Sequence, residues 1–375
     1  MRIGYSATIW DDAGSGIGLY IAEQLKQLRK TEGIDLKVLE FGGRVLESDQ
    51  TPAFGSSGRG VRRIVAPAKD IIWHRNGLKE MVAREAFDLV HVPTIRRLPG
   101  SLPCPSVVTV HDLGPVRLAQ KYGRLRDVYH RKVIPGWLDD VTAIVTPSEA
   151  TLEDLVEIYD CDRKKITVVP NGLDHDAFSP GDPVESRDRM VSEFGLEAPF
   201  FVYISRLEHP AKNHLSLIEA FARFKEKDRD GFKLVCVGGE WNGSDLIKET
   251  ASRLCSPEDV LFTGFVDGDD VPHFLRAATA MVYPSFYEGF GLPVIEAMAC
   301  GVPVACSRSS SLTEIAEGKA LLFDPHSIEE IHHTLNRMAA EPELRQDLRR
   351  KGLVHAAGFT WERSVRETVS VWKSI

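Results

Sequence analysis

The stretch 283-YPSFYEGFGLPVIEAMACGVPV-304 decides the fold, because it predicts a glycine-rich turn and a short helix between two strands, "AMVYPS" at 280–285 and "VPVACS" at 302–307. Pro293 suits the start of a helix, where its fixed φ costs nothing, and Gly301 suits the end. Glu288 and Glu296 are the only charged residues in this otherwise apolar stretch. Since ligands of open α/β sheets bind at the carboxyl ends of strands, near helix N-termini, the two carboxylates predict a ligand site.

The same alternation of short β-rich runs and amphipathic helical stretches extends along the chain in both directions, which predicts parallel sheets built from βαβ units. With 375 residues the chain exceeds the size of one core. The strand rhythm pauses in the polar run "SPGDPVESRDRM" and then restarts. We therefore expect two tandem Rossmann-like domains: residues 1–178 with a returning helix at 359–375, a linker at 179–194, and residues 195–358.

The composition is that of a globular protein, with 43% hydrophobic and 27% charged residues and no apolar run long enough to span a membrane. The start "MRIGYSATIW" lacks the pattern of a secretory signal, so we expect a cytoplasmic protein. The six cysteines are scattered, and no His or Cys spacing typical of a metal site occurs. The sequence therefore predicts neither a bound metal nor a cofactor.

Residues 59–132 are strongly basic, with 15 Lys or Arg against 6 Asp or Glu, and Trp73, Phe87, Tyr122 and Tyr129 are interspersed among them. This pattern is typical of a surface that faces anionic lipid or a phosphorylated partner. It is equally typical of an ordinary solvated basic face. Peripheral contact with the inner face of a membrane is therefore a hypothesis, whereas nothing indicates a nucleic-acid partner.

Glu296 lies in a predicted helix with almost no polar face, so its carboxylate needs hydroxyl groups or a cation nearby. Vicinal hydroxyls of a ribose or sugar meet that need with charge-assisted hydrogen bonds, while the helix N-terminus suits an adjoining phosphate. A nucleotide fits this description. The alternatives are a salt bridge on the side of the helix for Glu296 and a capping role for Glu288.

The run "YISRLEHPAKNH" places two cations, Arg206 and Lys212, after the first strand of the second domain. Two cations at a strand end, one of them at the opening of a helix, are suited to a diphosphate. Their expected position at the same sheet edge as the Glu288 loop distinguishes them from ordinary surface charges.

In the first domain, "DDAGSGIGLYIAEQL" sets Gly14, Gly16 and Gly18 between a strand and a helix, where backbone amides can approach a ligand. The glycine pattern also resembles the dinucleotide-binding fingerprint of a dehydrogenase. A short-chain dehydrogenase would need a Tyr-x-x-x-Lys pair as well, and the sequence lacks one. His111 and Asp112 end another predicted strand and are candidate functional residues. Ser148 is better explained as a helix N-cap.

With these motifs in view, the sequence resembles the retaining, nucleotide-sugar-dependent glycosyltransferases called group 1 or family four, whose fold is GT-B. The resemblance rests on the Glu288-to-Glu296 element with its flanks, on "SRLEHPAKN", on "VVPNGLD", on "VTVHDL" and on the N-terminal glycine loop. It implies two Rossmann-like domains with a cleft between them and a C-terminal helix that crosses back to the first domain. It also implies independence from a bound metal.

The resemblance further implies catalytic roles for Arg206, Lys212, Glu288 and His111, and donor-binding roles for Gly16, Phe290, Gly291, Leu292 and Glu296. Glu296 would hold the donor ribose, and Arg206 with Lys212 the diphosphate. Glu288 would contact the transferred sugar. The backbone of Phe290, Gly291 and Leu292 would contact the sugar and its phosphate. His111 would lie against the sugar, and Gly16 would lie over the phosphate.

The implied activity is transfer of a mannose-, rhamnose- or glucose-type hexose, with retention, to a saccharide or lipid-linked acceptor in cell-surface polysaccharide or glycolipid synthesis. Two alternatives remain open at this point. One is an epimerase of the same fold, which would bind the same donor without an acceptor. The other is a catalytically silent nucleotide-sugar-binding scaffold, against which the presence of Arg206, Lys212 and Glu288 argues.

Overall fold

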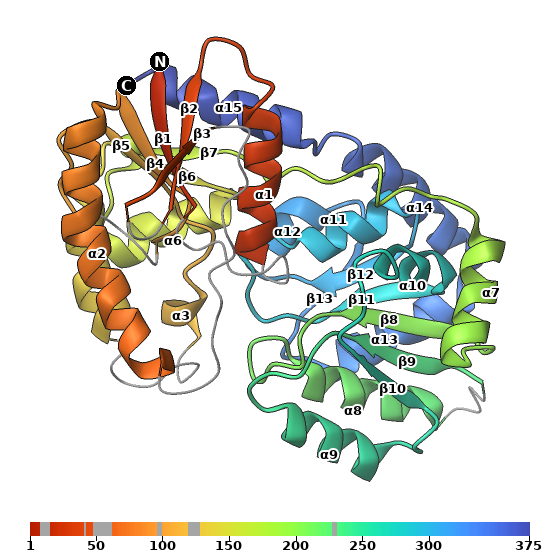
Figure 1. Cartoon of the computed structure of the whole chain (residues 1–375). Helices are drawn as coiled ribbons and strands as arrows, with labels where there is room; N and C mark the ends of the chain where they lie inside the picture. Colours follow the sequence, from red (N-terminus) through yellow and green to blue (C-terminus); the bar gives the residue numbers. More distant parts are fainter. Residues whose placement is uncertain (8–15, 41–42, 48–61, 96–99, 119–127, 227–230) are drawn as a thin grey trace. The chain divides into compact units, whose positions relative to one another are not determined.

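A computed structural model describes seven segments of the chain, which are residues 1–7, 16–40, 43–47, 62–95, 100–118, 128–226 and 231–375. They form two compact units (Figure 1): Met1–Gly172 with Trp361–Ile375, and Leu173–Thr360. Within these segments, no helix combines the length and the apolar character that crossing a membrane requires.

The first unit is built on a seven-stranded sheet in the order β3-β2-β1-β4-β5-β6-β7. All neighbouring strands are parallel except β2 and β3, which are antiparallel. Most of its strands are buried on both faces, which explains their continuous apolar sequences. The strands are β1 (Arg2–Ser6), β2 (Asp35–Leu39), β3 (Val45–Glu47), β4 (Leu89–Val92), β5 (Ser106–Thr109), β6 (Ala143–Thr146) and β7 (Ile166–Val168).

Helices pack on this sheet, and the last helix of the chain is one of them. The longer helices are α1 (Gly16–Leu28), α2 (Arg62–Glu85), α6 (Glu149–Tyr159) and α15 (Trp361–Lys373), and the shorter ones are α3 (Gly114–Arg117), a π-helix (Tyr129–Val133), α5 (Ile134–Leu138) and a 3₁₀ turn (Arg163–Lys165). The predicted apolar stripe of the C-terminal helix is confirmed, since Trp361, Val365, Val369 and Trp372 are buried in the core of this unit. The chain thus ends in the unit where it begins.

A buried polar chain fastens α15 to the sheet. Trp372 Nε1 donates to His91 Nδ1 at 3.0 Å, and His91 Nε2 lies 2.8 Å from the hydroxyl of Thr109. Since Nδ1 accepts, Nε2 carries the proton and donates to Thr109. Burial, helped by the nearby His111, lowers the pKa of His91 from 6.5 to about 3, so this imidazole is neutral in the folded unit.

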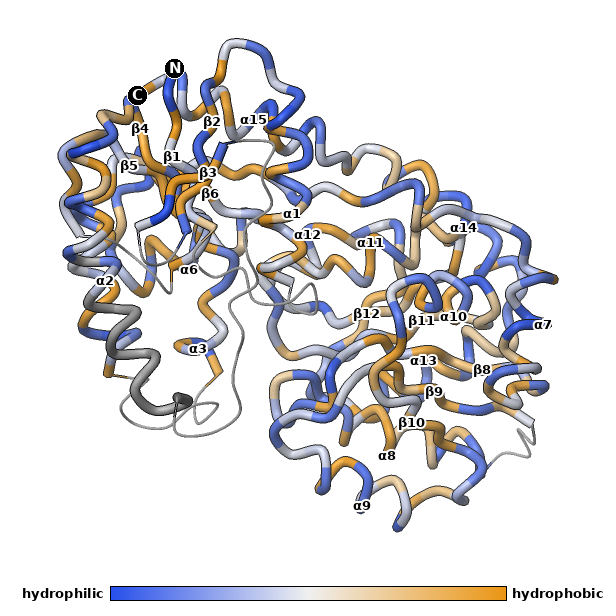
Figure 2. The backbone as a smooth tube through the Cα atoms, in the orientation of Figure 1, coloured by the Kyte–Doolittle hydropathy of each residue, from blue (hydrophilic) through white to orange (hydrophobic). Residues whose placement is uncertain are grey.

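The second unit has a six-stranded, all-parallel sheet in the order β10-β9-β8-β11-β12-β13. Its strands are β8 (Phe200–Ile204), β9 (Lys233–Val237), β10 (Val260–Gly264), β11 (Ala280–Tyr283), β12 (Val304–Ser307) and β13 (Leu321–Phe323). Figure 2 shows these strands mostly in orange, in keeping with the large apolar core that they share with the surrounding helices. The strands β3 and β13, each at an outer edge of its sheet, are only three residues long.

The helices of the second unit connect its strands and pack on the sheet. They are α7 (Pro183–Phe194), α8 (His214–Lys225), α9 (Ser244–Leu254), α10 (Val271–Ala277), α11 (Leu292–Ala299), α12 (Ser310–Ala316), α13 (Ile328–Ala340) and α14 (Pro342–Ala356). The predicted order of strand, turn, helix and strand over 280–307 is confirmed by β11, α11 and β12. The helix begins at Leu292, so that Pro293 occupies its second position instead of its first.

The predicted linker at 179–194 is wrong, because most of it is the helix α7. The Asp182 side chain caps this helix by accepting from Val184 N at 2.8 Å, and Gly195 ends it in the left-handed conformation at φ 64°. Met190 on α7 is fully buried in the core of the second unit. The first unit accordingly ends at Gly172, six residues before the predicted boundary at 178.

The basic stretch 59–132 lies only partly in the described segments, and Tyr122 lies outside them. Phe87 is buried in a small cluster beneath α2, and Trp73 packs against the same cluster. Tyr129 is partly buried against another cluster of the first unit. Phe87 is therefore a core residue and not part of a surface, whereas Trp73 and Tyr129 are only half-buried.

We expect His91 to make the first unit sensitive to acid. In the unfolded chain this imidazole binds a proton near pH 6.5, whereas in the folded unit it stays neutral down to about pH 3. The unfolded state therefore binds more protons in this range, and the free energy of unfolding should fall by about 2 kcal/mol from pH 7 to pH 5 through His91 alone. Denaturant unfolding of the parent and of His91→Gln at both pH values measures this loss, which the variant should lack. An equal loss in both proteins would contradict the assignment.

Candidate functional site

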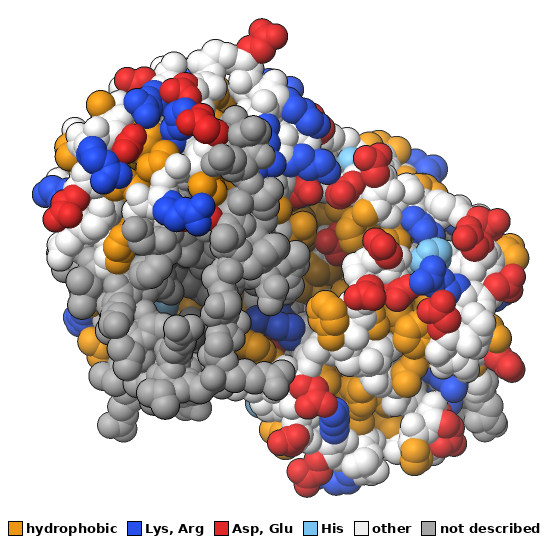
Figure 3. Space-filling model, in the orientation of Figure 1, with side chains coloured by type: hydrophobic (Ala, Val, Ile, Leu, Met, Phe, Trp, Pro, Cys, Tyr) orange, Lys and Arg blue, Asp and Glu red, His pale blue; other side chains and the backbone are white. Residues whose placement is uncertain are grey.

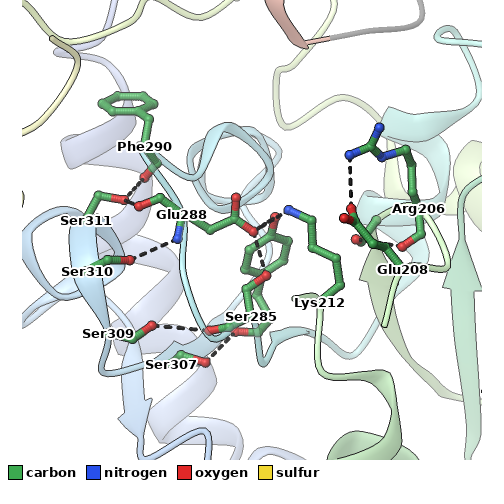
Figure 4. A network of polar contacts seen from close by, with 12 residues as sticks. Arg206, Glu208, Lys212, Ser285, Glu288, Phe290, Ser307, Ser309, Ser310 and Ser311 are labelled. Carbon is green, nitrogen blue, oxygen red and sulfur yellow. Dashed lines mark hydrogen bonds and ion pairs between the residues drawn. The ribbon is translucent and has the colours of Figure 1, made fainter. Parts of the chain in front are cut away.

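The candidate site lies where the strand order of the second sheet reverses, between β8 and β11. β8 lies between β9 and β11, so the loops after β8 and β11 lead to opposite sides of the sheet. In open α/β sheets this switch point forms a crevice at the carboxyl ends of the strands. Lys212 follows β8 and Glu288 follows β11, and Lys212 Nζ lies 2.6 Å from Glu288 Oε1 (Figure 4). The structure thus brings together two residues that are 76 positions apart in the sequence.

One oxygen of Glu288 gathers three donors. Besides Lys212, the Tyr283 hydroxyl donates to Oε1 at 2.9 Å and the Ser285 hydroxyl at 2.5 Å. Burial raises the pKa of Tyr283 well above its usual value, and the Glu288 charge raises it further, so the phenol remains a donor. Across the described segments no hydrogen bond reaches Oε2 of Glu288. The carboxylate is therefore held firmly through one oxygen, while the other can accept from a ligand hydroxyl.

The backbone of the Glu288 loop is braced from the start of α12. Glu288 N donates to the Ser310 hydroxyl at 3.0 Å, and the Ser311 hydroxyl is shared between the carbonyl oxygens of Glu288 at 2.9 Å and Phe290 at 3.0 Å. Gly291 has φ +99°, and a Cβ there would lie 2.6 Å from Leu312 Cδ2. These contacts fix the turn into α11, and the residues Ser310 and Ser311 were missed by the sequence analysis, although the run "SRSSS" was a visible signal.

The Lys212 backbone is fixed on both sides. The Tyr203 hydroxyl donates to the Lys212 carbonyl at 2.6 Å. The next residue, Asn213, is in the left-handed conformation at φ 53°, and its Nδ2 donates to the carbonyls of Pro284 at 3.1 Å and Pro325 at 2.8 Å. The start of α8 is therefore tied to the ends of β11 and β13. Asn213 is thus a positioning residue that the sequence alone did not single out.

Arg206 shares the loop after β8 with Lys212 but points to a different partner (Figure 4). Its Nη2 donates to Glu208 Oε2 at 3.0 Å, and its guanidinium lies 4.8 Å from the centre of the Trp241 ring. The side chain of Glu208 is 3% exposed, whereas that of Arg206 is 50% exposed. A buried carboxylate and an aromatic face thus orient the guanidinium of Arg206, which remains half-exposed and can still bind an anion.

Glu296 lies on α11, one turn after the Glu288 loop, with a half-buried side chain. Burial raises the pKa of its carboxyl from 4.5 to about 7. No hydrogen bond or ion pair to this carboxyl occurs within the parts of the chain that the structure describes, so the alternative of a helix-side salt bridge is wrong. A desolvated carboxyl without a partner at a sheet edge is a strong candidate for contact with a ligand.

The remaining candidates belong to the first unit. His111 follows β5, and its Nε2 donates to the Pro93 carbonyl at 3.0 Å, while its ring contacts Tyr20 edge-on at 4.6 Å. Gly16 opens α1, and an added Cβ there would meet nothing within 4 Å, whereas Gly14 lies outside the described residues. The expected contacts of His111 and Gly16 with a donor stay predictions.

Two neighbours of these residues serve the fold. The carboxylate of Asp112 accepts from Gly114 N at 2.8 Å and so caps the short helix that follows. Ser148 caps α6 by accepting from Thr151 N at 3.1 Å, as the sequence predicted. In the described part of the chain, no group of three or more His, Cys, Asp or Glu side chains is arranged to hold a metal ion.

Comparison with known sequences identifies the two halves separately. Residues 184–354 match the family model described as "Glycosyl transferases group 1", and residues 14–177 match the one described as "Glycosyltransferase Family 4". The O-antigen chain mannosyltransferase B of Escherichia coli is 29% identical over 268 residues, which cover 72% of this chain and 70% of that protein. A D-inositol 3-phosphate glycosyltransferase of Frankia alni is 31% identical over 396 residues, covering 95% and 93%.

Solved structures show the same fold. HepE of Anabaena, crystallised with UDP-glucose, aligns with a TM-score of 0.74 at 19% identity and covers 99% of each chain. At this identity the likeness concerns the fold alone. Together with the two parallel sheets, it confirms the GT-B fold expected from the sequence.

We expect Gly291→Ala to disturb the Glu288 loop. The substitution forces a side chain into a left-handed conformation and against Leu312, which should lower the free energy of unfolding of the second unit by about 1–3 kcal/mol. Gly268→Ala in the same unit is the matched control, because a Cβ there would meet nothing within 4 Å. Denaturant unfolding of both variants measures the difference. Equal midpoints for the two variants would show that the loop does not need glycine at position 291.

Proposed function

This chain belongs to the group 1 glycosyltransferase family, and from that premise we propose that it transfers a hexose from a nucleoside-diphosphate sugar to a saccharide or lipid-linked acceptor, with retention of anomeric configuration. The observation that carries the proposal is the pairing of Lys212 with Glu288 at the switch point of the second sheet. A cation and a hydroxyl acceptor side by side suit the phosphate and the sugar of such a donor. HepE, which shares the fold, was crystallised with UDP-glucose, and the E. coli relative is named a mannosyltransferase.

In this proposal different residues of the second unit bind different parts of the donor. Glu296 accepts from the ribose hydroxyls, as a desolvated carboxylate without a partner can. Arg206 and Lys212 bind the diphosphate. Glu288 accepts from a hydroxyl of the transferred sugar through Oε2, and the backbone of the loop from Phe290 through Leu292 lies against the sugar and its phosphate.

The first unit contributes two further contacts in this proposal. His111 lies against the transferred sugar. Gly16 contributes its backbone over the phosphate, since it is the first residue of α1 and lies in the glycine-rich run of the sequence.

The proposed reaction breaks the bond between the anomeric carbon and the phosphate oxygen, and the acceptor oxygen bonds to the same face of the sugar. The proton of the acceptor hydroxyl passes to the leaving phosphate oxygen, so no protein base is needed. The chain then acts by electrostatic stabilisation, because Arg206 and Lys212 face the charge that develops on the leaving group. One well-placed donor of this kind contributes about 3–4 kcal/mol to the transition state. A bound metal is not required by this scheme.

We expect one class among UDP, GDP, dTDP and ADP sugars to raise the melting temperature of the parent, because a ligand that binds only the folded state stabilises it. The rise should collapse in Glu296→Ala and in Arg206→Ala, which remove the ribose acceptor and a diphosphate cation. Arg253→Ala is the matched control, since Arg253 is an exposed arginine on α9 of the same unit. A screen in which no nucleotide sugar shifts the parent, or in which the control loses the shift as well, would contradict the donor site.

The stabilising donor also separates this proposal from its two alternatives. A transferase consumes the donor only when a saccharide or lipid-linked acceptor is added. An epimerase converts the donor without an acceptor, and a silent scaffold binds it without turnover. Chromatography of the nucleotide products distinguishes the three outcomes when the reaction is run with and without an extract that contains saccharide and lipid-linked acceptors.

Nucleotide affinity should depend on pH through Glu296. Its carboxyl has a pKa near 7, and only the ionised form accepts from two ribose hydroxyls. Between pH 8 and pH 6 the Kd of the nucleotide should therefore weaken by up to about tenfold. Calorimetric titrations of the parent and of Glu296→Gln measure this, and the variant should bind weakly and without that dependence. A parent whose affinity is the same at both pH values would contradict the role of Glu296.

A lipid-linked acceptor would bring the chain to a membrane surface, and the excess of basic residues at 59–132 supports contact there. Vesicles that contain anionic lipid should retain the protein at low salt and release it at high salt, because screening weakens the attraction. Neutral vesicles serve as the control. Failure of anionic vesicles to retain the protein at low salt would remove the membrane contact from the proposal.

A further inference from the structure

The second unit contains a cavity of about 520 Å³ at the sheet edge opposite to the Lys212–Glu288 pair. Phe200, which begins β8, and Thr279 and Pro303, which directly precede β11 and β12, line this cavity. The cavity therefore lies at the amino ends of the strands whose carboxyl ends carry the donor site. One face of α14 forms part of its wall, through residues spaced three and four apart.

Arginine dominates the charge of this cavity. Its lining includes four arginines and one glutamate, which are Arg187, Arg276, Arg345, Arg349 and Glu197. The unit as a whole is acidic, with 19 Lys or Arg against 30 Asp or Glu in residues 173–360, and Figure 3 shows red acidic side chains across its visible face. The ends of α10 and α11 also reach this edge, but each adds only about half a negative charge. The cavity is thus positive within an acidic unit.

Two of the four arginines are held in place by neutral acceptors. Arg276 Nε donates to the Ser179 carbonyl at 2.8 Å, and Arg345 Nη1 donates to the carbonyls of Met338 at 2.7 Å and Ala339 at 3.0 Å. These hydrogen bonds to backbone carbonyls are a sufficient structural explanation for the presence of Arg276 and Arg345. They fix the two guanidinium groups but do not neutralise them, since none of the four arginines forms an ion pair within the described segments.

The other two arginines have no such explanation. Neither Arg187 nor Arg349 makes a hydrogen bond or an ion pair to any residue that the structure describes. The Arg349 guanidinium lies against Gly301, where φ is +72° and a Cβ would come within 3.2 Å of Arg349 Nε. Gly181 likewise leaves room for Arg276, whose Nε would lie 2.7 Å from a Cβ at that position. Glycines in the left-handed conformation thus make space for charged groups at this cavity.

We propose that this cavity is a second anion site, which binds a small phosphate-bearing molecule independently of the donor site. Arginine forks match the geometry of phosphate oxygens and bind them in pairs. A volume of about 520 Å³ lies in the range of small-molecule sites. Thr279 and Gln346 on the lining add neutral hydrogen-bonding groups. A bound phosphate would relieve the repulsion among four arginines that form no ion pair with the described part of the chain.

Phosphate chemistry of this kind has two sources, a free phosphorylated molecule and the headgroup of an anionic lipid. The first test uses inorganic pyrophosphate, titrated calorimetrically into the full chain at low salt. The parent should bind at two sites, one of which is the donor site. The double variant Arg187→Gln/Arg349→Gln should lose one site by tenfold or more, and Arg206→Gln/Lys212→Met should lose the other. Arg253→Gln should keep both.

Arg187 and Arg349 are exposed, so their replacement should leave the fold intact, which circular dichroism and the melting temperature check directly. A single binding site that disappears in Arg206→Gln/Lys212→Met alone would overturn the proposal. An equal weakening in Arg187→Gln/Arg349→Gln and in Arg253→Gln would overturn it as well, because it would show attraction by overall charge. Loss of the donor site alone would leave the second site standing.

A second arm distinguishes the sources. Vesicles of phosphatidylglycerol are mixed with the parent and with Arg187→Gln/Arg349→Gln, with and without pyrophosphate. If the headgroup is the source, the vesicles retain the parent more strongly than the variant, and pyrophosphate removes the difference. If the source is a free molecule, pyrophosphate binds to the second site while vesicles hold both proteins equally.

Discussion

The ion pair between Lys212 and Glu288 is the contact on which the geometry of the second unit's ligand edge depends. It joins the loops that follow the neighbouring strands β8 and β11, where the strand order reverses and the connections leave on opposite sides of the sheet. The surrounding hydrogen bonds all serve to hold this pair. Tyr283 and Ser285 fix the carboxylate, while Tyr203 fixes the backbone of the lysine. A parallel sheet can assemble such a site only from residues far apart in the chain, because its neighbouring strands are never joined by short hairpins.

The site keeps its charges in different states. The Lys212 and Glu288 charges compensate each other, whereas Arg206 is oriented by a buried glutamate and remains half-exposed. Glu296 makes no hydrogen bond or ion pair with any residue that the structure describes, and burial raises the pKa of its carboxyl to about 7. A carboxyl so placed costs the isolated protein stability at neutral pH, and hydroxyl groups of a ligand would offset this cost. This is the kind of local conflict that folding alone does not explain and that ligand binding does.

Much of the fold and of the candidate site was predictable from the sequence, because the patterns that indicate strands, turns and helices are local. Strands buried on both faces read as continuous apolar runs, and the order of strand, glycine turn and helix over 283–304 predicted the loop that carries Glu288. Lys212 and Glu288 were expected at one edge because both follow strands of one parallel sheet. Glu296 was expected to need hydroxyl groups or a cation nearby because its helix offers almost no polar face.

What the sequence did not predict depends on contacts between distant residues. Asn213 looks like an ordinary helix cap, yet its side chain bonds the carbonyls of Pro284 and Pro325, which no local pattern reveals. Ser310 and Ser311 act on a loop more than twenty residues away. The polar composition of α7 resembled a linker because only residues such as Met190 on one narrow face are buried. The arginine cavity escaped notice because its members come from separate helices and loops.

A crystal structure of the chain with the nucleoside-diphosphate sugar that stabilises it would show directly whether the second unit binds the donor as proposed. We expect the ribose hydroxyls within hydrogen-bond distance of Glu296, the diphosphate at Arg206 and Lys212, and the sugar beside Oε2 of Glu288. A donor bound elsewhere, with the pair between Lys212 and Glu288 untouched and Glu296 still without a partner, would contradict the proposal.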